Sequence, residues 1–338
     1  MKPVQEYTYM DLHTAGEPFR LIIDPTPAIP GKTMEEKRRY ASEHLGDLRR
    51  LVLREPRGHD NMYGGLLMPP VREGSDIGIL FMTTEGMTTM CGHGIICLTR
   101  AAAELGLLRL HDGENFLMID APSATVRSSL FVSGGDIRRI SFTNDLSFSC
   151  GLDIPVQVPG YGTVPVDIGY GAAFMVFVQA ADLHLTLERK NFTQMLDAAV
   201  RCRRAVMEQL DVQHPQDAQK TLQRNGFCLI LTNTPVRQGN TLESHCFTVY
   251  GDEGLFDRSP TGTGTSALTA ILYEKGLLTL DTVLVNHGIS GIPFTASIQP
   301  AVGGVIPTIS AMAYVTGRGK LILEEGDPLT VGFSVTSD

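Results

Sequence analysis

Two glycine turns lie 170 positions apart, and each has the composition of an anion-binding helix start. Residues 91–108 read CGHGIICLTRAAAELGLL, and residues 261–278 read TGTGTSALTAILYEKGLL. Glycines beside the first residues of a helix let several amide N–H groups face one point, where the positive helix end favours an anion. A substrate carboxylate or a thiolate would suit such a turn. Cys91 and Thr261 begin the two segments, and of this pair Cys91 is the nucleophile or base.

The two segments agree at eight of eighteen positions without a gap. Ordinary residue frequencies give roughly one such match. The matched pairs are Gly92/Gly262, Gly94/Gly264, Leu98/Leu268, Thr99/Thr269, Glu104/Glu274, Gly106/Gly276, Leu107/Leu277 and Leu108/Leu278. We infer an internal duplication.

The same order of elements precedes each turn. In the first half, a strand over 19–23 is followed by Thr33-Met-Glu-Glu36, a capping box that predicts one helix carrying Leu45, Leu48, Leu51 and Val52. In the second half, a strand over 172–178 is followed by a helix capped at Asn191. Further strands are expected over 77–86 and 245–254, each ending in Glu-Gly before its turn, and over 116–120 and 138–145.

This plan predicts an α/β fold of two similar domains packed face to face, with the two glycine turns meeting across a cleft. We expect residues 1–145 to form the first domain and residues 146–324 the second. The C-terminal segment, about 325–338, is expected to complete the first domain.

The helix start and the adjacent His93 both favour a thiolate at Cys91, because an ordinary cysteine titrates near 8.5. The alternative is that both turns merely begin helices, with Cys91 buried and inert; their duplication favours a shared site. Asp257 either holds a substrate ammonium or forms a surface pair with Arg258. The loop 57–61 has no role assigned beyond lining a cleft, and the second turn lacks the GxxxxGK[ST] of a nucleotide site.

Composition narrows the class of protein. The 338 residues are 43% hydrophobic and 19% charged, with a net charge of −9, which favours two globular domains and argues against a nucleic-acid partner. No secretory signal or run of eighteen apolar residues is found, so we expect a cytoplasmic protein with no membrane partner. The cysteines lack the spacing of a metal site. Five of them are expected to be packing residues: Cys97, Cys150, Cys202, Cys228 and Cys246.

Four motifs together resemble the proline racemase family, which includes hydroxyproline 2-epimerases and trans-3-hydroxy-L-proline dehydratases. They are DLHTAGEP at 11–18, RGHDNMYGG at 57–65, MCGHG at 90–94 and DRSPTGTGTSA at 257–267. The resemblance implies two domains of the diaminopimelate-epimerase type, each a strand-rich wall around a central helix, with the active site in the cleft between them. It also implies catalysis without a cofactor or metal, a small imino-acid substrate and a homodimer.

Racemising members carry a cysteine at both turns, whereas this chain has Thr261 at the second. A threonine hydroxyl is a weak acid, and nothing adjacent in the sequence looks like a base that would activate it. The Cys/Thr pair resembles the dehydratase branch. The resemblance makes Cys91 the base and Asp257 the ligand of the ring nitrogen. It assigns the remaining substrate contacts to Gly92, His93, Thr261, Gly262 and Thr263.

The expected activity is therefore dehydration of trans-3-hydroxy-L-proline to Δ1-pyrroline-2-carboxylate. Hydroxyproline 2-epimerase or proline racemase activity, with water or another residue as the second proton donor, is the first alternative. The second is a non-catalytic imino-acid-binding protein that kept the cleft. An isomerase from a broader group with the same fold is disfavoured by the full DRSPTGTGTSA match.

Overall fold

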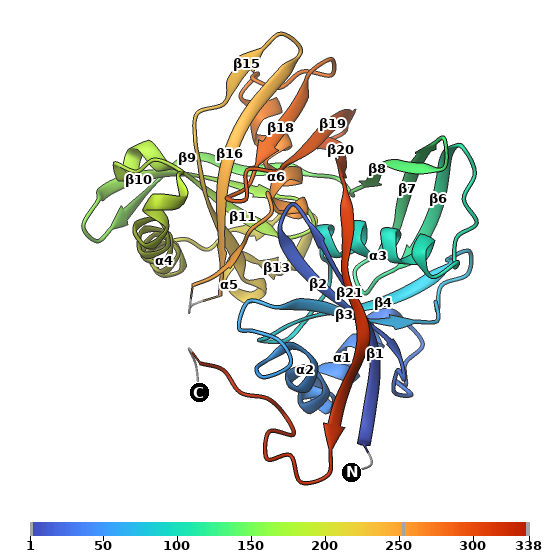
Figure 1. The fold of residues 1–338 in the computed structure, drawn as a ribbon. Coiled ribbons are helices and arrows are strands. Elements are labelled where there is room, and N and C mark those ends of the chain that lie inside the picture. Colours follow the sequence, from blue (N-terminus) through green and yellow to red (C-terminus); the bar gives the residue numbers. More distant parts are fainter. Residues whose placement is uncertain (1–2, 252–253, 336–338) are drawn as a thin grey trace. The chain divides into compact units, whose positions relative to one another are not determined.

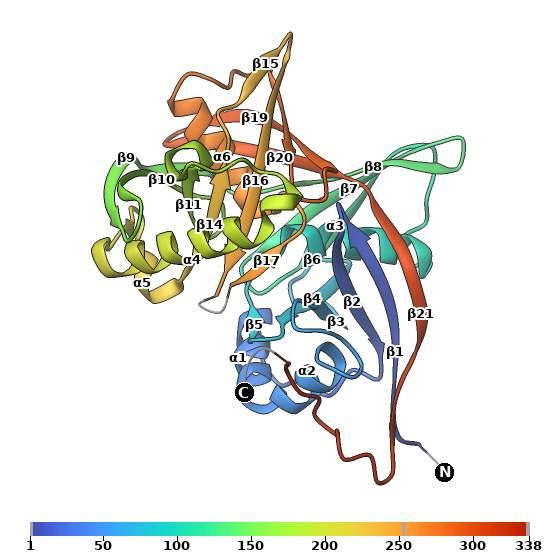
Figure 2. The same cartoon turned by 60° about the vertical axis from the view of Figure 1, so that its left-hand side comes forward.

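The computed structural model describes residues 3–251 and 254–335, which form two strand-rich α/β units. Unit 1 comprises Met1–Phe142 and Ala311–Asp338, and unit 2 comprises Thr143–Ser310. The α/β class predicted from the sequence is confirmed. Figure 1 and Figure 2 label the elements of both units.

Unit 1 contains one continuous series of paired strands. The order is β21-β1-β2-β3-β4-β6-β7-β8, in which β2–β3 and β4–β6 are parallel and the other neighbours antiparallel. The strands are β1 (Pro3–Thr14), β2 (Glu17–Asp24), β3 (Tyr63–Met68), β4 (Ile77–Thr83), β6 (Gly113–Asp120), β7 (Thr125–Ser133), β8 (Asp136–Thr143) and β21 (Ala313–Glu324). The short β5 (Met87–Thr88) pairs with β4 just before the first glycine turn.

Unit 2 contains a corresponding series, β9-β10-β11-β14-β16-β18-β19-β20, in which β11–β14 and β16–β18 are the parallel pairs. The strands are β9 (Phe148–Val158), β10 (Gly162–Tyr170), β11 (Phe174–Gln179), β14 (Phe227–Thr232), β16 (Thr241–Tyr250), β18 (Val283–His287), β19 (Pro293–Ala301) and β20 (Gly304–Ala311). The short β17 (Leu255–Asp257) and β15 (Val236–Gln238) pair with β16, and β12 (Gln213–His214) pairs with β13 (Asp217–Thr221).

The two series repeat the same sequence of parallel and antiparallel neighbours, but their first strands come from different places in the chain. In unit 2, β9 directly precedes β10, whereas in unit 1 the corresponding place beside β1 is taken by β21, near the C-terminus. Both views show β21 running along β1 (Figure 1, Figure 2). The first observed boundary lies at 142/143, close to the expected 145/146. The second lies at 310/311 and not at the expected 324/325, because residues 313–324 pair with β1 and belong to unit 1.

A central helix packs against the strands of each unit. Helix α3 (Gly92–Glu104) contacts β1, β2, β7 and β21, and helix α6 (Gly262–Glu274) contacts β9, β10, β11 and β19. Every residue of α6 from Gly262 to Leu272 is buried. These buried residues are uncharged, either apolar or carrying a hydroxyl group, as a helix enclosed in a core requires.

The outer helices differ in part from the sequence prediction. Thr33 caps as expected, since its hydroxyl accepts from the amide of Glu36, but the chain forms two helices, α1 (Met34–His44) and α2 (Gly46–Leu53), separated at Leu45. Leu45 has φ −112° and ψ 22°, outside the helical range. The prediction of a single helix was therefore wrong.

In unit 2, α4 (Phe192–Gln209) covers β9, β14 and β16. Asn191 precedes this helix without capping it, because its side-chain amide donates to Thr186. The short α5 (Leu222–Asn225) and the 3₁₀ turns Ala180–Leu183 and Arg189–Asn191 complete the helical segments of the described chain. The predicted strand at 245–254 lies within β16 up to Tyr250, and residues 252–253 lie outside the described part.

Candidate active site

Cys91 is the N-cap of α3, and its sulfur occupies the place of a capping oxygen. The Gly94 amide donates to Cys91 Sγ at 3.2 Å, and the residue is 5% exposed. Ser, Thr, Asp and Asn are the usual N-caps, so a cysteine here places a thiol where a hydroxyl or carboxylate is common. The amide donor and the positive helix end both stabilise negative charge on sulfur.

His93 lies against the same sulfur and is held by aromatic rings. Its Nδ1 is 3.2 Å and its Nε2 3.6 Å from Cys91 Sγ. The imidazole packs edge-on against Tyr63 at 4.7 Å and Phe19 at 6.0 Å between ring centroids. This packing limits rotation of the imidazole, so the Cys91–His93 contact is a fixed feature of unit 1.

The space around Cys91 requires glycine at position 94. A Cβ added there would lie 2.7 Å from Phe81, 2.9 Å from Phe19 and 3.0 Å from Cys91 Sγ. The glycine of the CGHG motif therefore allows the helix, the aromatic side chains and the thiol to approach one another closely.

The second turn is organised differently. Thr261 is the N-cap of α6 but makes no side-chain capping bond, and its backbone has φ +61° and ψ 116°. Positive φ is unusual for a β-branched residue. The Thr261 hydroxyl instead lies 2.8 Å from Asp257 Oδ2 and 3.1 Å from Thr248 Oγ1, oriented as donor to both. Asp257 Oδ1 accepts from the Ser259 amide at 2.7 Å.

Asp257 is 5% exposed, so the alternative of a surface Asp-Arg pair is wrong. The Arg258 guanidinium lies over the Phe256 ring, 4.7 Å from its centroid. The Asp257 carboxylate, which sequence reasoning did not place against Thr261, accepts from its hydroxyl. A carboxylate is far less basic than an alkoxide, so this contact orients the hydroxyl without ionising it.

A buried polar layer holds the backbone at Pro260 and Thr261. Thr265 Oγ1 donates to the Pro260 carbonyl at 3.1 Å and accepts from Asn286 Nδ2 at 3.0 Å. The Thr265 amide also donates to the Thr261 carbonyl at 2.7 Å, and the Thr261 amide donates to Ser259 Oγ at 3.1 Å. Strained backbone persists where surrounding contacts determine it, and these contacts do so here.

The residues predicted for the site therefore form two local groups. Unit 1 brings together Cys91, Gly92 and His93, and unit 2 brings together Asp257, Thr261, Gly262 and Thr263. In each first turn, helix geometry leaves the leading amides without an intrahelical carbonyl, which makes both turns suitable for a carboxylate.

Sequence reasoning missed Thr248 and Asn286. Thr248 faces Asp257 across β16 and β17, where the two are directly paired. Cross-strand partners lie side by side on one face of a sheet, but no pattern in the sequence predicts this register. Asn286 lies 21 residues beyond Thr265 in β18, and the sequence gives no signal of their contact.

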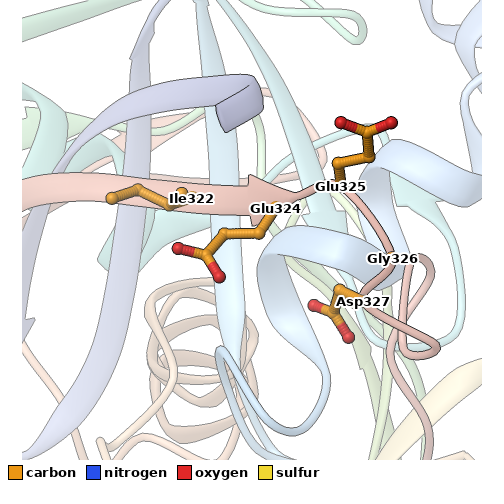
Figure 3. A pocket seen from close by; sticks show the side chains of 5 residues that line it. All are labelled: Ile322, Glu324, Glu325, Gly326 and Asp327. Atoms are coloured by element: carbon orange, nitrogen blue, oxygen red, sulfur yellow. The ribbon is translucent and has the colours of Figure 1, made fainter. Parts of the chain in front are cut away.

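Arg57 of the RGHDNMYGG motif is tied to the C-terminal segment. Its guanidinium pairs with Asp327 and donates to the Leu329 carbonyl at 2.9 Å. Asp327 lines a pocket of about 500 Å³ together with Ile322, Glu324, Glu325 and Gly326. Figure 3 shows Ile322 and Glu324 on β21 and Asp327 in the turn after it. The Arg57 side chain thus anchors the C-terminal segment, and the cleft-lining role considered for the loop 57–61 stays a prediction.

The five cysteines outside the first turn have the surroundings of packing residues. Cys97, Cys202 and Cys246 are buried, and none of the six cysteines forms a disulfide bond. Burial raises the pKa of Cys150, Cys202 and Cys228 to about 12. Burial also raises the pKa of Cys97 and Cys246, so these five side chains remain protonated near pH 7.

The residues that the structure describes lack two kinds of feature. They contain no cluster of three or more His, Cys, Asp or Glu side chains suited to hold a metal ion. Their helices are all too short or too polar to cross a membrane.

The chain is similar to known proteins over almost its whole length. The proline racemase family pattern matches residues 9–334. A 3-hydroxyproline 2-epimerase of Burkholderia multivorans is 35% identical, and a trans-3-hydroxy-L-proline dehydratase of Azospirillum brasilense is 34% identical; each alignment covers 99% of this chain and 100% of the relative. The crystal structure of a hydroxyproline epimerase from Agrobacterium vitis, with bound trans-4-OH-L-proline, matches with a TM-score of 0.87 at 24% identity, covering 99% of this chain and 96% of that one. The chain therefore belongs to the proline racemase family.

Proposed function

We propose that this enzyme dehydrates trans-3-hydroxy-L-proline to Δ1-pyrroline-2-carboxylate. The observation that carries the proposal is the difference between the two turns: a sulfur caps α3 at Cys91, whereas Thr261 stands at the matching position of α6 with its hydroxyl turned to Asp257. The proposal requires that groups from both turns bind one imino acid. The two turns together supply one thiol for proton transfer, Cys91, which suits an elimination on one face of the ring.

The stereochemistry of the substrate makes one base sufficient. In trans-3-hydroxy-L-proline the C3 hydroxyl lies opposite the carboxylate and shares a ring face with the Cα hydrogen. The Cys91 thiolate removes the Cα proton, and the electrons of that C–H bond form the Cα=C3 double bond as the C3–O bond breaks. The proton on sulfur passes to the departing hydroxyl, which leaves as water and regenerates the thiolate. The resulting enamine tautomerises to Δ1-pyrroline-2-carboxylate.

The remaining groups bind and stabilise the substrate. The helix-start amides around Gly92 and His93, and around Gly262 and Thr263, would hold the carboxylate and stabilise the charge that develops on it. Asp257 would accept from the ring ammonium. These steps need no cofactor or metal ion. We further expect a cytoplasmic homodimer; measurement of the molar mass in solution tests the dimer.

Hydroxyproline 2-epimerase or proline racemase activity remains the alternative, supported by the 35% identity to a 3-hydroxyproline 2-epimerase. It would need a second proton donor such as water. A non-catalytic imino-acid-binding protein is a further alternative, which tight binding of proline analogues without solvent exchange at Cα would favour.

Proton NMR of trans-3-hydroxy-L-proline with the purified protein in D₂O tests the proposal. Loss of the C3 carbinol signal with appearance of Δ1-pyrroline-2-carboxylate is expected. Exchange or inversion at Cα with the hydroxyl retained would instead establish the epimerase alternative.

Two substitutions test the assignment of residues. Cys91→Ala is expected to abolish elimination, whereas Cys150→Ala, which removes a partly buried thiol outside the two turns, is expected to retain it. Full elimination activity in Cys91→Ala would show that the base is another group. Thr261→Cys is expected to introduce Cα epimerisation by supplying a second thiol.

A further inference from the structure

The Thr261 hydroxyl has one proton and two acceptors within reach. Asp257 Oδ2 lies at 2.8 Å and Thr248 Oγ1 at 3.1 Å, and Thr261 Oγ1 is oriented as donor to both. The carboxylate is the closer and the charged acceptor, so it takes the proton in a charge-assisted hydrogen bond. In this arrangement the hydroxyl proton points to Asp257 and is not directed at a reacting carbon.

The hydrogen bond from the Thr261 hydroxyl is one of two that the Asp257 carboxylate accepts. Oδ1 accepts from the Ser259 amide at 2.7 Å, and Oδ2 accepts from the Thr261 hydroxyl. The backbone pairing of Asp257 with Thr248 fixes the base of the side chain. Each carboxylate oxygen retains a lone pair after these bonds, so the charge is oriented but still able to accept from a cation.

We propose that Thr261 is a positioning residue, whose hydroxyl orients the Asp257 carboxylate to bind a cationic ring nitrogen. The inference rests on the proposed imino-acid substrate and assigns Thr261 a role other than filling space or donating a proton. The positive φ of Thr261 fits this role, because it turns the side chain away from capping α6 and toward Asp257.

Two ligands that differ at the ring heteroatom test the proposal. L-Proline carries a ring ammonium, whereas (S)-tetrahydrofuran-2-carboxylate has the same ring size and carboxylate with an ether oxygen in its place. Both are bound without loss of water, since neither has a hydroxyl to eliminate. The dissociation constants are measured by calorimetry for the full chain and its variants, with dehydration of trans-3-hydroxy-L-proline assayed separately.

Thr261→Val removes the hydroxyl and keeps the branched shape, while Thr261→Ser keeps the hydroxyl and removes the methyl group. Because hydrogen bonds to charged groups are the stronger class, we expect Thr261→Val to weaken L-proline binding by about tenfold or more and the ether ligand by less than about twofold. Thr261→Ser is expected to recover most of the L-proline affinity. Thr248→Val, which removes only the second and longer contact, is expected to change both dissociation constants by less than about threefold.

If Thr261 only fills space, Thr261→Val should bind L-proline about as tightly as the unsubstituted chain, and Thr261→Ser should bind it more weakly. This order of affinities would overturn the proposal. Equal weakening of both ligands in Thr261→Val would also overturn it, as would failure of the unsubstituted chain to bind L-proline. If Thr261→Val does not fold, Thr261→Ala replaces it with the same ligand pair and the same expected selectivity. Failure of the dehydratase proposal is distinguishable, because it would show as absent dehydration while the selectivity for L-proline remains.

Discussion

Substituting Gly94 with alanine tests whether close packing around the thiol is needed for its function. The added Cβ would lie 2.7 Å from Phe81 Cε1, 2.9 Å from Phe19 Cε2 and 3.0 Å from Cys91 Sγ. All three distances are shorter than ordinary van der Waals contacts, so at least one neighbour must move. Both aromatic rings are fully buried, so relief of these two clashes should shift the helix start that Cys91 caps, and with it the sulfur.

The expected change in stability is small. Overpacking a core costs about 1–3 kcal/mol, whereas alanine gains roughly 1 kcal/mol over glycine within a helix. The net loss in the free energy of unfolding is therefore about 0–2 kcal/mol, which urea denaturation can measure. The enzyme should fold.

The expected change in rate is larger. Displacement of Cys91 Sγ breaks its 3.2 Å contact with the Gly94 amide. A hydrogen bond to a charged group contributes about 1.5–3 kcal/mol, which corresponds to roughly a 10- to 150-fold fall in kcat for dehydration if the amide stabilises the thiolate. The assay is the initial rate of Δ1-pyrroline-2-carboxylate formation at saturating substrate.

Gly264→Ala is the matched control in the second turn. Its Cβ would meet the Ile230 Cδ1 atom at 2.7 Å and Thr261 Cβ at 3.2 Å, with no thiol beside it. We expect a similar change in unfolding free energy and a smaller loss of kcat than in Gly94→Ala. An unchanged kcat in Gly94→Ala, or an equal fall in both variants, would refute the role given to the sulfur contact.

Three further predictions concern stability. Asn286→Ala should lower the unfolding free energy by about 0.5–1.5 kcal/mol in urea denaturation, because it removes the buried donor to Thr265 Oγ1, which keeps its bond to the Pro260 carbonyl; no change would show that the contact is dispensable. The pKa of His245 is lowered by partial desolvation of its largely exposed ring and by His287, stacked on it at 4.8 Å. The unfolded chain therefore binds this proton first, and the free energy of unfolding should fall as the pH drops below about 6.5 toward the folded pKa. His245→Gln should flatten that part of the pH profile, and an unaltered profile would count against this histidine. Arg57→Ala should speed proteolytic cleavage after β21, read by mass spectrometry, and equal cleavage of both chains would contradict the anchoring by Arg57.

The sequence predicted those elements that are determined by residues a few positions apart. The glycine turns begin α3 and α6, each thirteen residues long, because the repeated residues themselves define a helix start and an apolar core helix. The strand at 19–23 likewise lies within β2. These features depend on neighbours a few positions away, which a sequence pattern can report.

Features set by distant partners were not predictable in the same way. The segment 313–324 alternates in a manner compatible with a strand in either unit, and its pairing with β1 joins residues about 300 positions apart. The register that sets Thr248 beside Asp257 depends on β16 and β17 together. The break at Leu45 does have a local signal, because Gly46, a residue type that disfavours helix interiors, follows it directly and begins α2.

The asymmetry of the two turns goes beyond the exchange of one residue type. Cys91 has extended backbone, with φ −149°, and its sulfur accepts from Gly94, whereas Thr261 has φ +61° and turns its oxygen toward Asp257. The Thr261 methyl carbon lies 3.4 Å from the Cβ position of Gly264, comparable with the 3.0 Å between Cys91 Sγ and the Cβ position of Gly94.

In Thr261→Cys the introduced sulfur thus has two places to occupy. In the oxygen's place it would face the Asp257 carboxylate, and this charge would oppose a thiolate. In the methyl group's place it would approach the Gly264 amide, as Cys91 approaches Gly94. Epimerisation is therefore expected to be weak in Thr261→Cys and to strengthen when Asp257→Asn is added, provided that substrate binding is saturated by raising its concentration. If the double variant epimerises no faster than the single one at saturation, the carboxylate does not control the second thiol.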